Sequence, residues 1–315
     1  DRHTAFYERR AAGGCGVIVT EGASVHTSDW PYERAPLAER CGDGWATIAE
    51  ACHRHGSLVL ASLDHAGGQG SRAYSQAALW APSRVPEVNT REVPKWMEAR
   101  DVEAVIAGFA SAAAAAVGAG CDGVEINAGQ HSLVRQFLSG LTNHRGDEWG
   151  ETRHLFAQRV IEAVRAAVGD AIVGLRLSCD ELAPWAGITP DLAVQLAPVL
   201  VAAGVDHLVV VRGAIFSAEK TRPDHHEPTG FNIDLCRRVR EAVPGTPVYL
   251  QGSVVDPGQA EWALGDGVAD GVEMTRAHLA DPQLVRRLAA GQAAQVRPCI
   301  RCNQTCQVRD ARNPI

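Results

Sequence analysis

Residues 118–127 read GAGCDGVEIN, and this stretch decides the fold class. A glycine-rich segment, typical of a helix end, is followed directly by a short apolar run at 122–127. The same succession recurs as AGGCG before 16–22, AAGVDH before 207–211 and GDGVADG before 270–276. A unit of helix, glycine-rich exit and strand is therefore repeated, which predicts an α/β architecture.

The apolar runs are continuous rather than alternating, as in strands of a parallel sheet that is buried on both faces. Amphipathic segments with apolar residues at three-to-four spacing lie between them and predict helices. The predicted strands are 16–22, 57–65, 122–127, 172–178, 207–211, 247–253 and 270–276. The predicted helices are 45–55, 101–118, 153–168, 190–203, 232–243, 257–265 and 282–290.

Seven strands, each followed by a helix, favour a (β/α)8 TIM barrel over residues 1–292, although a closed barrel needs eight strands. The chain opens on a helix-like segment that ends in AGG, so we expect barrel strand one to precede residue 1. A doubly wound sheet remains the alternative. No GxGxxG follows the first strand, which weighs against a dinucleotide-binding domain of that kind.

Composition excludes some classes of function. The 315 residues carry a formal net charge of −7 without a basic run, so we expect no nucleic-acid partner. The longest apolar stretch, 107–120, is alanine-dominated and shorter than a membrane span, so we expect no membrane partner. With no signal-peptide pattern, we expect a cytoplasmic protein. A homo-oligomer remains open.

Strand ends carry the candidate chemistry, because active sites of barrels lie at the carboxyl ends of the strands. Gly252 and Arg276 lie at the ends of the last two predicted strands, where barrels commonly bind a phosphate; a tight turn and a structural ion pair are the alternatives. Arg176 lies within an apolar strand, so it faces a ligand, such as the N1/O2 edge of a flavin, or is paired in a salt bridge. Long polar loops at 66–100 and 212–231 fall at the same end.

Three of the nine cysteines are closely spaced. Cys299, Cys302 and Cys306 form a C-x2-C-x3-C pattern, whereas the other six are scattered and read as reduced thiols. Thiolate ligation at such spacing is ordinary in iron–sulfur sites. Zinc is the alternative, although zinc sites prefer pairs of C-x2-C motifs.

The stretch CDGVEINAGQHSLVRQFLSGLTNHRGDEWG (121–150) resembles the signature of the old yellow enzyme family of FMN-dependent barrels. GGCGVIVTEGASV, VGLRLS and VEMTRAHLADPQLVRRL resemble further motifs of that family. The terminal PCIRCNQTC resembles the iron–sulfur segment of the branch that includes 2,4-dienoyl-CoA reductase and trimethylamine dehydrogenase. The resemblance covers essentially the whole chain.

The resemblance implies FMN and a [4Fe–4S] cluster. Residues 293–315 would begin the cluster-binding segment, with Cys299, Cys302 and Cys306 as ligands and a fourth cysteine beyond residue 315. It also implies a following domain that binds FAD and NAD(P)H. The implied FMN contacts are Gly22, Ser62, Arg176, Gly252, Ser253, Thr275 and Arg276. Ser62 replaces the family glutamine, and Thr275 replaces a glycine.

The substrate-binding residues depart further from the family. Asn127 and Gln130 stand where the family has two histidines, or a histidine and an asparagine, to hold a carbonyl. Ser132 replaces the tyrosine proton donor, so the neighbouring His131 is the candidate acid. Ser217 falls where the dienoyl reductases have a histidine. His225 and His226 lie further along that loop. Each is either a candidate for the same role or a solvated loop histidine without a role in catalysis.

Three hypotheses follow. The first is an FMN-dependent oxidoreductase of the 2,4-dienoyl-CoA reductase type, which moves a hydride to an activated C=C of a small-molecule substrate and relays electrons through the cluster. The second is an amine or N-methyl dehydrogenase on the same scaffold, because oxidation of an amine needs no tyrosine acid. The third is a non-catalytic barrel, motivated by the changes at Ser62, Gln130 and Ser132.

Overall fold

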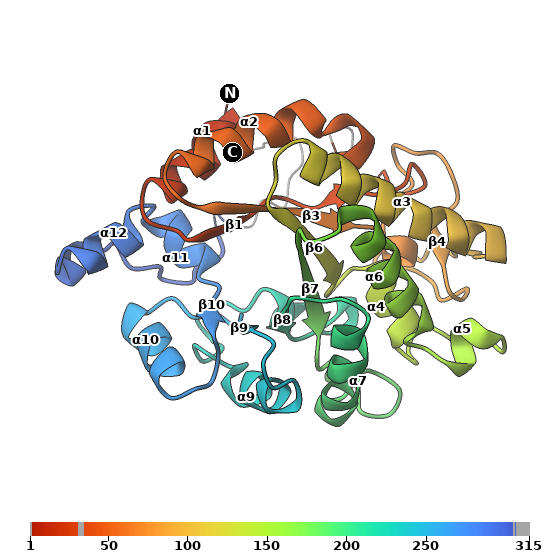
Figure 1. Ribbon diagram of the computed structural model, residues 1–315. Coiled ribbons are helices and arrows are strands. Elements are labelled where there is room, and N and C mark those ends of the chain that lie inside the picture. Colours follow the sequence, from red (N-terminus) through yellow and green to blue (C-terminus); the bar gives the residue numbers. More distant parts are fainter. Residues whose placement is uncertain (1, 31–34, 305, 307–315) are drawn as a thin grey trace.

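The computed structural model describes residues 2–30, 35–304 and 306. Its main sheet is entirely parallel, and its strands neighbour one another in chain order (Figure 1). They are β1 (Val17–Val19), β3 (Leu58–Asp64), β6 (Gly123–Ala128), β7 (Ile172–Ser178), β8 (His207–Val211), β9 (Val248–Leu250) and β10 (Gly271–Val272). The seven predicted strands are thus confirmed, and the sequential order excludes a doubly wound sheet, in which the order reverses.

The sheet curls, and helices lie outside it (Figure 1). Within the described residues β1 and β10 stand at the two ends of the strand path, so one further parallel strand between them would close a barrel. The outer helices are α1 (Arg2–Ala11), α2 (Gly42–His53), α3 (Ala99–Gly118), α6 (Leu155–Val168), α7 (Pro190–Ala202), α9 (Ile233–Ala242), α10 (Pro257–Gly265), α11 (Thr275–Ala280) and α12 (Leu284–Ala289).

Two of the predicted helix starts are confirmed. The Thr189 hydroxyl accepts a hydrogen bond from the Leu192 N–H, and Asp256 accepts one from the Gly258 N–H, each with proline at the first helical position. The third start was wrong. Helix α12 begins at Leu284, because Asp281 is the C-cap of α11, with its backbone N–H bonded to the Ala277 carbonyl. Its carboxylate accepts hydrogen bonds from the Gln283 and Arg297 N–H groups and from the Arg287 side chain.

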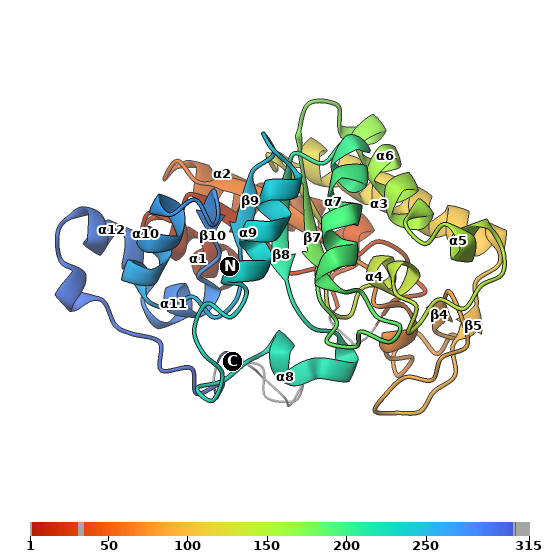
Figure 2. The same cartoon turned by 90° about the horizontal axis from the view of Figure 1, so that it is seen from below.

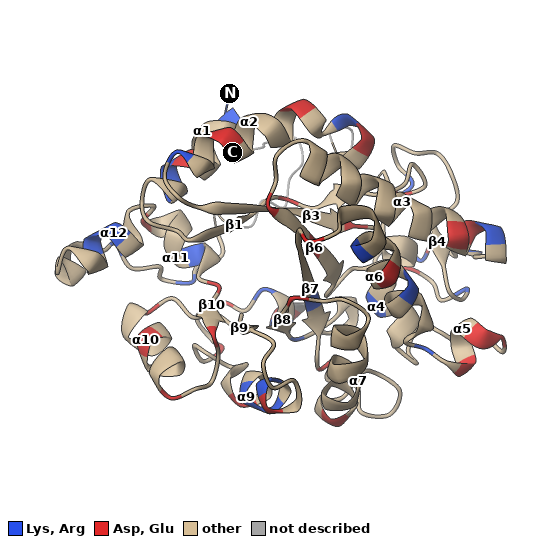
Figure 3. Cartoon of the chain, in the orientation of Figure 1, with Lys and Arg blue, Asp and Glu red and all other residues tan. Residues whose placement is uncertain are grey.

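Helix α3 would be long and apolar enough to cross a membrane by length and composition alone. Its Val102, Val105 and Phe109 are fully buried in the same core as the strand residues. This one-sided burial is the arrangement of an outer helix of the barrel. On the face drawn in Figure 3, acidic and basic residues are interspersed over the outer helices.

The shorter elements lie in the loops. Strand β2 (Ala23–Ser24) pairs with the end of β3, and β4 (Trp80–Ala81) pairs with β5 (Lys95–Trp96) within the long 66–100 loop. Helices α4 (Leu133–Leu138) and α5 (Glu148–Glu151) follow β6, and α8 (Ala218–Thr221) follows β8. Figure 2 shows α8 beside the chain that runs on from α12, so this loop and the cysteine segment adjoin.

Candidate active site

One end of the site, lined by arginines, lies after β9 and β10. Arg276, in the first turn of α11, donates to the Ser253 hydroxyl, to the Asn303 side chain at 2.8 Å and to the Pro223 carbonyl at 2.5 Å. These residues border a cavity of 340 Å³. Its polar lining residues include Thr221, Arg222, Gln251, Ser253, Glu273, Thr275, Arg276 and Asn303. A cavity with two arginines, Arg222 and Arg276, suits an anionic group.

The backbone after β9 has a conformation that lets a ligand approach it closely. Gly252 has φ of +157°, and a Cβ there would lie 3.0 Å from the Cβ of Asn232. Ser253 has φ of +57°, a left-handed conformation that costs a non-glycine residue about 1 kcal/mol. The sequence predicted a phosphate-binding turn here, and its geometry fits that role.

Arg176 is paired. Its guanidinium donates to Glu125 at 2.8 Å and to Glu273 at 2.6 Å, so one cation meets two carboxylates. Burial raises the pKa of Glu125, with the nearby Arg176 charge acting against it, and one Glu125 oxygen has no partner among the described residues. Arg176 therefore forms a salt bridge within the protein, and its role as a flavin contact stays a prediction. The sequence analysis missed Glu273, because its partner lies 97 residues away.

The two amides expected to hold a substrate carbonyl are engaged within the protein. Asn127 accepts a hydrogen bond from the Gly129 N–H at 2.8 Å, and its side chain also hydrogen-bonds Asp64. Gln130 donates to the Thr221 carbonyl at 3.2 Å. Neither amide is positioned here as a free donor.

The side chains near the family's proton donor position are poor acids. Ser132 is fully buried, donates to the Asn127 carbonyl and caps α4 by accepting from the Val134 N–H at 3.0 Å. Burial, followed by the positive charges of Arg222 and Arg135, lowers the pKa of His131 to about 4, so its imidazole is neutral near pH 7. Ser217 is buried and bonded to backbone atoms of Ala214 and Glu181.

Asp64 is a functional candidate that the sequence analysis missed. It is the last residue of β3, and its carboxylate accepts from the His65 N–H at 2.7 Å. A Cβ built at Gly22 would lie 3.8 Å from Asp64 Oδ2 and 3.9 Å from Ser62 Oγ, so three strand-end residues meet here. Burial and then the negative charge of Asp29 raise the pKa of Asp64 to about 7. Its position two residues after Ser62, on the same face of the strand, was the available signal.

The three closely spaced cysteines lie around the same cavity. Cys299, Cys302 and Cys306 line a 320 Å³ cavity, together with Arg276, Leu279 and Asn303. All three are free thiols. Their placement around one hollow fits three ligands of a metal cluster, and the expected fourth ligand falls outside the described residues. Asn303 and Cys306 also border the arginine-lined cavity, so the two cavities adjoin.

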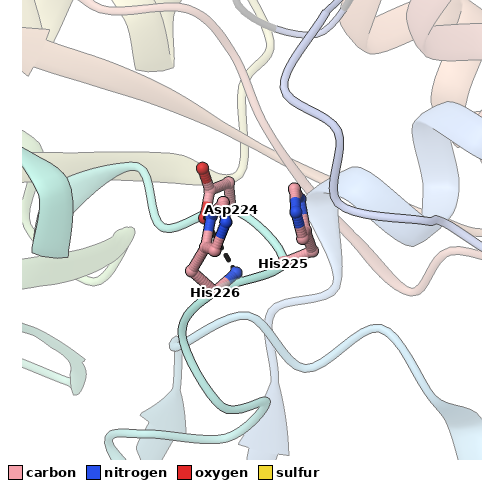
Figure 4. A group of neighbouring side chains, drawn as sticks. All are labelled: Asp224, His225 and His226. Atoms are coloured by element: carbon pink, nitrogen blue, oxygen red, sulfur yellow. Dashed lines mark hydrogen bonds and ion pairs between the residues drawn. The ribbon is translucent and has the colours of Figure 1, made fainter.

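His225 and His226 lie with Asp224 in the loop after α8 (Figure 4). Their potential ligand atoms lie within 4.8 Å of one another. Both histidines are exposed, and His226 Nδ1 is 2.9 Å from the Asp224 carboxylate. These contacts fit solvated loop histidines, and neither reaches the strand-end residues described above.

A sequence model of the NADH:flavin oxidoreductase / NADH oxidase family matches residues 1–295. The chain belongs to this family. It is 32% identical to the N,N-dimethylglycine/sarcosine dehydrogenase of Chromohalobacter salexigens, over 96% of this chain and 45% of that protein. The structure is similar to 2-naphthoyl-CoA reductase (TM-score 0.90, 25% identity, 96% of this chain and 49% of that one). It is also similar to histamine dehydrogenase from Rhizobium sp. 4-9 (TM-score 0.87, 26% identity, 96% and 45%).

The chain thus spans about half the length of these relatives. Solved old yellow enzymes share the fold as well, so both the family resemblance and the barrel are confirmed. The family is one of flavin-dependent oxidoreductases, and the arginine-lined cavity with its glycine turn fits the phosphate of FMN. This membership weighs against the reading as a non-catalytic barrel.

Proposed function

We propose that the protein is a dehydrogenase of alkylated amines, with FMN in the barrel and a [4Fe–4S] cluster at Cys299, Cys302 and Cys306. The observation that carries the proposal is Ser132. Where the resemblance implies a tyrosine acid, a buried hydroxyl caps a helix and cannot protonate a substrate. Reduction of a C=C needs a proton donor at that position, whereas oxidation of an amine does not.

The relatives support this direction. Proteins named for the oxidation of N,N-dimethylglycine, sarcosine and histamine are among the chain's relatives. FMN supplies the hydride acceptor when bound. In this chain Arg276, Ser253 and the Gly252 turn would hold its phosphate, Arg176 would face its pyrimidine edge, and Gly22, Ser62 and Thr275 would complete the contacts.

The cysteine segment adjoins the arginine-lined cavity, and this supports a role for residues 293–315 in passing electrons from the flavin to the cluster. In the longer proteins of this kind an FAD- and NAD(P)H-binding domain would follow. Electrons would then leave through that domain. We propose a small-molecule substrate, no nucleic-acid or membrane partner, and a cytoplasmic location.

A second candidate is reduction of an enoyl-CoA or enone, as in the 2,4-dienoyl-CoA reductases. The structural likeness to 2-naphthoyl-CoA reductase favours it. For this reaction Asn127 and Gln130 would have to leave their internal partners to hold the substrate carbonyl, and His131 would have to act as the acid.

One experiment separates the two candidates. The flavin-loaded protein is mixed without oxygen with N,N-dimethylglycine, and in a parallel sample the photoreduced protein is mixed with 2-cyclohexenone. We expect the amine to bleach the flavin absorbance and the enone to leave the reduced flavin unchanged. Reoxidation by the enone with no bleaching by the amine would favour the second candidate.

A further inference from the structure

The carboxylate of Asp64 holds a central place among the strand-end residues. Ser62 and Asp64 share a face of β3, Asn127 comes from the neighbouring β6, and Gly22 follows β1 on the other side. Gly22 presents no side chain to Asp64, and a Cβ built there would be in van der Waals contact with it, 3.5 Å from the Asp64 Cβ and 3.8 Å from Oδ2. Asp64 as a residue is half-buried, so part of it is in contact with solvent.

The hydrogen bonds of Asp64 leave acceptor capacity. The His65 N–H donates to Oδ1, and the Asn127 side chain donates to the carboxylate. An ionised carboxylate has about four lone-pair positions, so at least one remains for a ligand. In the described part of the chain no lysine or arginine is paired with Asp64, so its charge is not neutralised by an ion pair.

We propose that Asp64 is the anionic contact for an alkylated ammonium group of the substrate, and that it accepts the ammonium proton. The inference rests on the proposed function and names the residue that selects its substrate class. In this step the N–H bond of the ammonium breaks, an O–H bond forms on Asp64, and the electron pair stays on nitrogen. The resulting free amine is the form that can lose a hydride from its α-carbon. The proton then leaves Asp64 for solvent.

The electrostatic surroundings suit this role. Asp29, in the loop after β2, is the charged side chain whose field reaches Asp64, while Asn127 of β6 and the His65 N–H oppose it. Burial and Asp29 together raise the pKa of Asp64 to about 7. A carboxylate with such a pKa can take up and release a proton near neutral pH, whereas an ordinary aspartate holds a proton poorly.

The test measures binding of tetramethylammonium, a cation with no proton to give, to the flavin-loaded protein by calorimetry between pH 5.5 and 8.5. For the wild type we expect binding to strengthen through pH 7 as Asp64 ionises. Asp64→Asn should weaken binding at pH 8 by about tenfold or more and remove the pH dependence. Asp64→Glu keeps the charge and should retain most of the affinity.

Asp43→Asn is the matched control, because Asp43 is an exposed carboxylate in the first turn of α2. Flavin absorbance verifies that each variant is folded and loaded. Unchanged tetramethylammonium binding in loaded Asp64→Asn would overturn the assignment of Asp64 and leave the amine dehydrogenase intact. A loaded wild type that no amine bleaches would instead contradict the proposed function.

Proton acceptance by Asp64 is tested separately, by the pH dependence of the rate at which N,N-dimethylglycine reduces the flavin in a single turnover. The wild-type rate should rise through pH 7, while in Asp64→Asn it should be slow and follow the titration of the free amine at high pH. A wild-type profile that Asp64→Asn reproduces would exclude Asp64 as the proton acceptor.

Discussion

Arg176 of β7 and Glu273 after β10 form an ion pair of 2.6 Å that links two strands not adjacent in the sheet. Glu125 accepts from the same guanidinium at 2.8 Å, so two carboxyl groups share one positive charge. In flavoenzymes a fixed positive charge beside N1/O2 stabilises the reduced flavin. With Arg176 facing the flavin as proposed, Glu273 would weaken that stabilisation.

Glu273→Gln should raise the midpoint potential of the bound flavin, since Arg176 then keeps more of its positive charge for the reduced anion. We expect a rise of about 30 mV, equivalent to about 1.4 kcal/mol for two electrons. Dye-equilibrated photoreduction measures the potential. Glu261→Gln, on the outer helix α10, is the control, and a drop in potential in Glu273→Gln would contradict this account.

Asp29→Asn should shift the pH dependence of tetramethylammonium binding downward. The negative charge at Asp29 raises the pKa of Asp64, so its removal lowers that pKa and Asp64 ionises at lower pH. The half-point of the binding curve, near pH 7 in the wild type, should move toward the acid side. The asparagine can still accept the hydrogen bond from the Ala66 N–H, which limits the structural effect.

Ser132→Ala should cost stability without slowing amine oxidation. Its hydroxyl caps α4, and loss of such a cap costs about 1 kcal/mol. Urea denaturation gives the free energy of unfolding, and flavin reduction by N,N-dimethylglycine gives the rate. A hundredfold slower reduction in a folded variant would show that this serine takes part in the chemistry.

Arg276→Ala should weaken FMN binding. The guanidinium borders the arginine-lined cavity and would provide charge-assisted hydrogen bonds to the phosphate. Loss of about 1.5 to 3 kcal/mol corresponds to roughly a 10- to 150-fold higher dissociation constant. Fluorescence quenching of FMN on binding measures it. Arg238→Ala, an exposed arginine of α9 paired with Asp191, should leave the constant unchanged.

Glu181→Gln should destabilise the fold strongly. Glu181 and Arg135 form an ion pair in which neither side chain is exposed, and Glu181 also accepts from Ser139 and from the Ile188 N–H. Removing one charge leaves the other buried and unpaired, at a cost of about 3 to 5 kcal/mol. Asp191→Asn, in a surface pair, should change the free energy of unfolding by less than about 0.5 kcal/mol.

The sequence predicted the strand path because each strand is a local apolar run, visible without knowledge of its neighbours. The long-range features escaped it. The Arg176–Glu273 pair joins residues far apart in the chain, and the approach of Asp64 to Asn127 depends on the register of β3 against β6. The β4–β5 pair was missed too, since two-residue strands carry no periodicity. The hydrogen-bond partners of Ser132, Gln130 and Ser217 could not be predicted either, because they depend on the conformation of the folded chain.

Asn303 accepts a hydrogen bond from Arg276 and donates one to the Arg222 carbonyl, and it lies between Cys302 and Cys306 in the sequence. The segment that carries the three cysteines therefore also positions Arg276, the arginine that would hold the flavin phosphate. With the proposed [4Fe–4S] cluster in place, assembly of the two cofactors would be interdependent. Iron starvation during growth would then yield protein that loses its flavin more readily, and an oxidant that destroys the cluster would weaken flavin binding in the barrel.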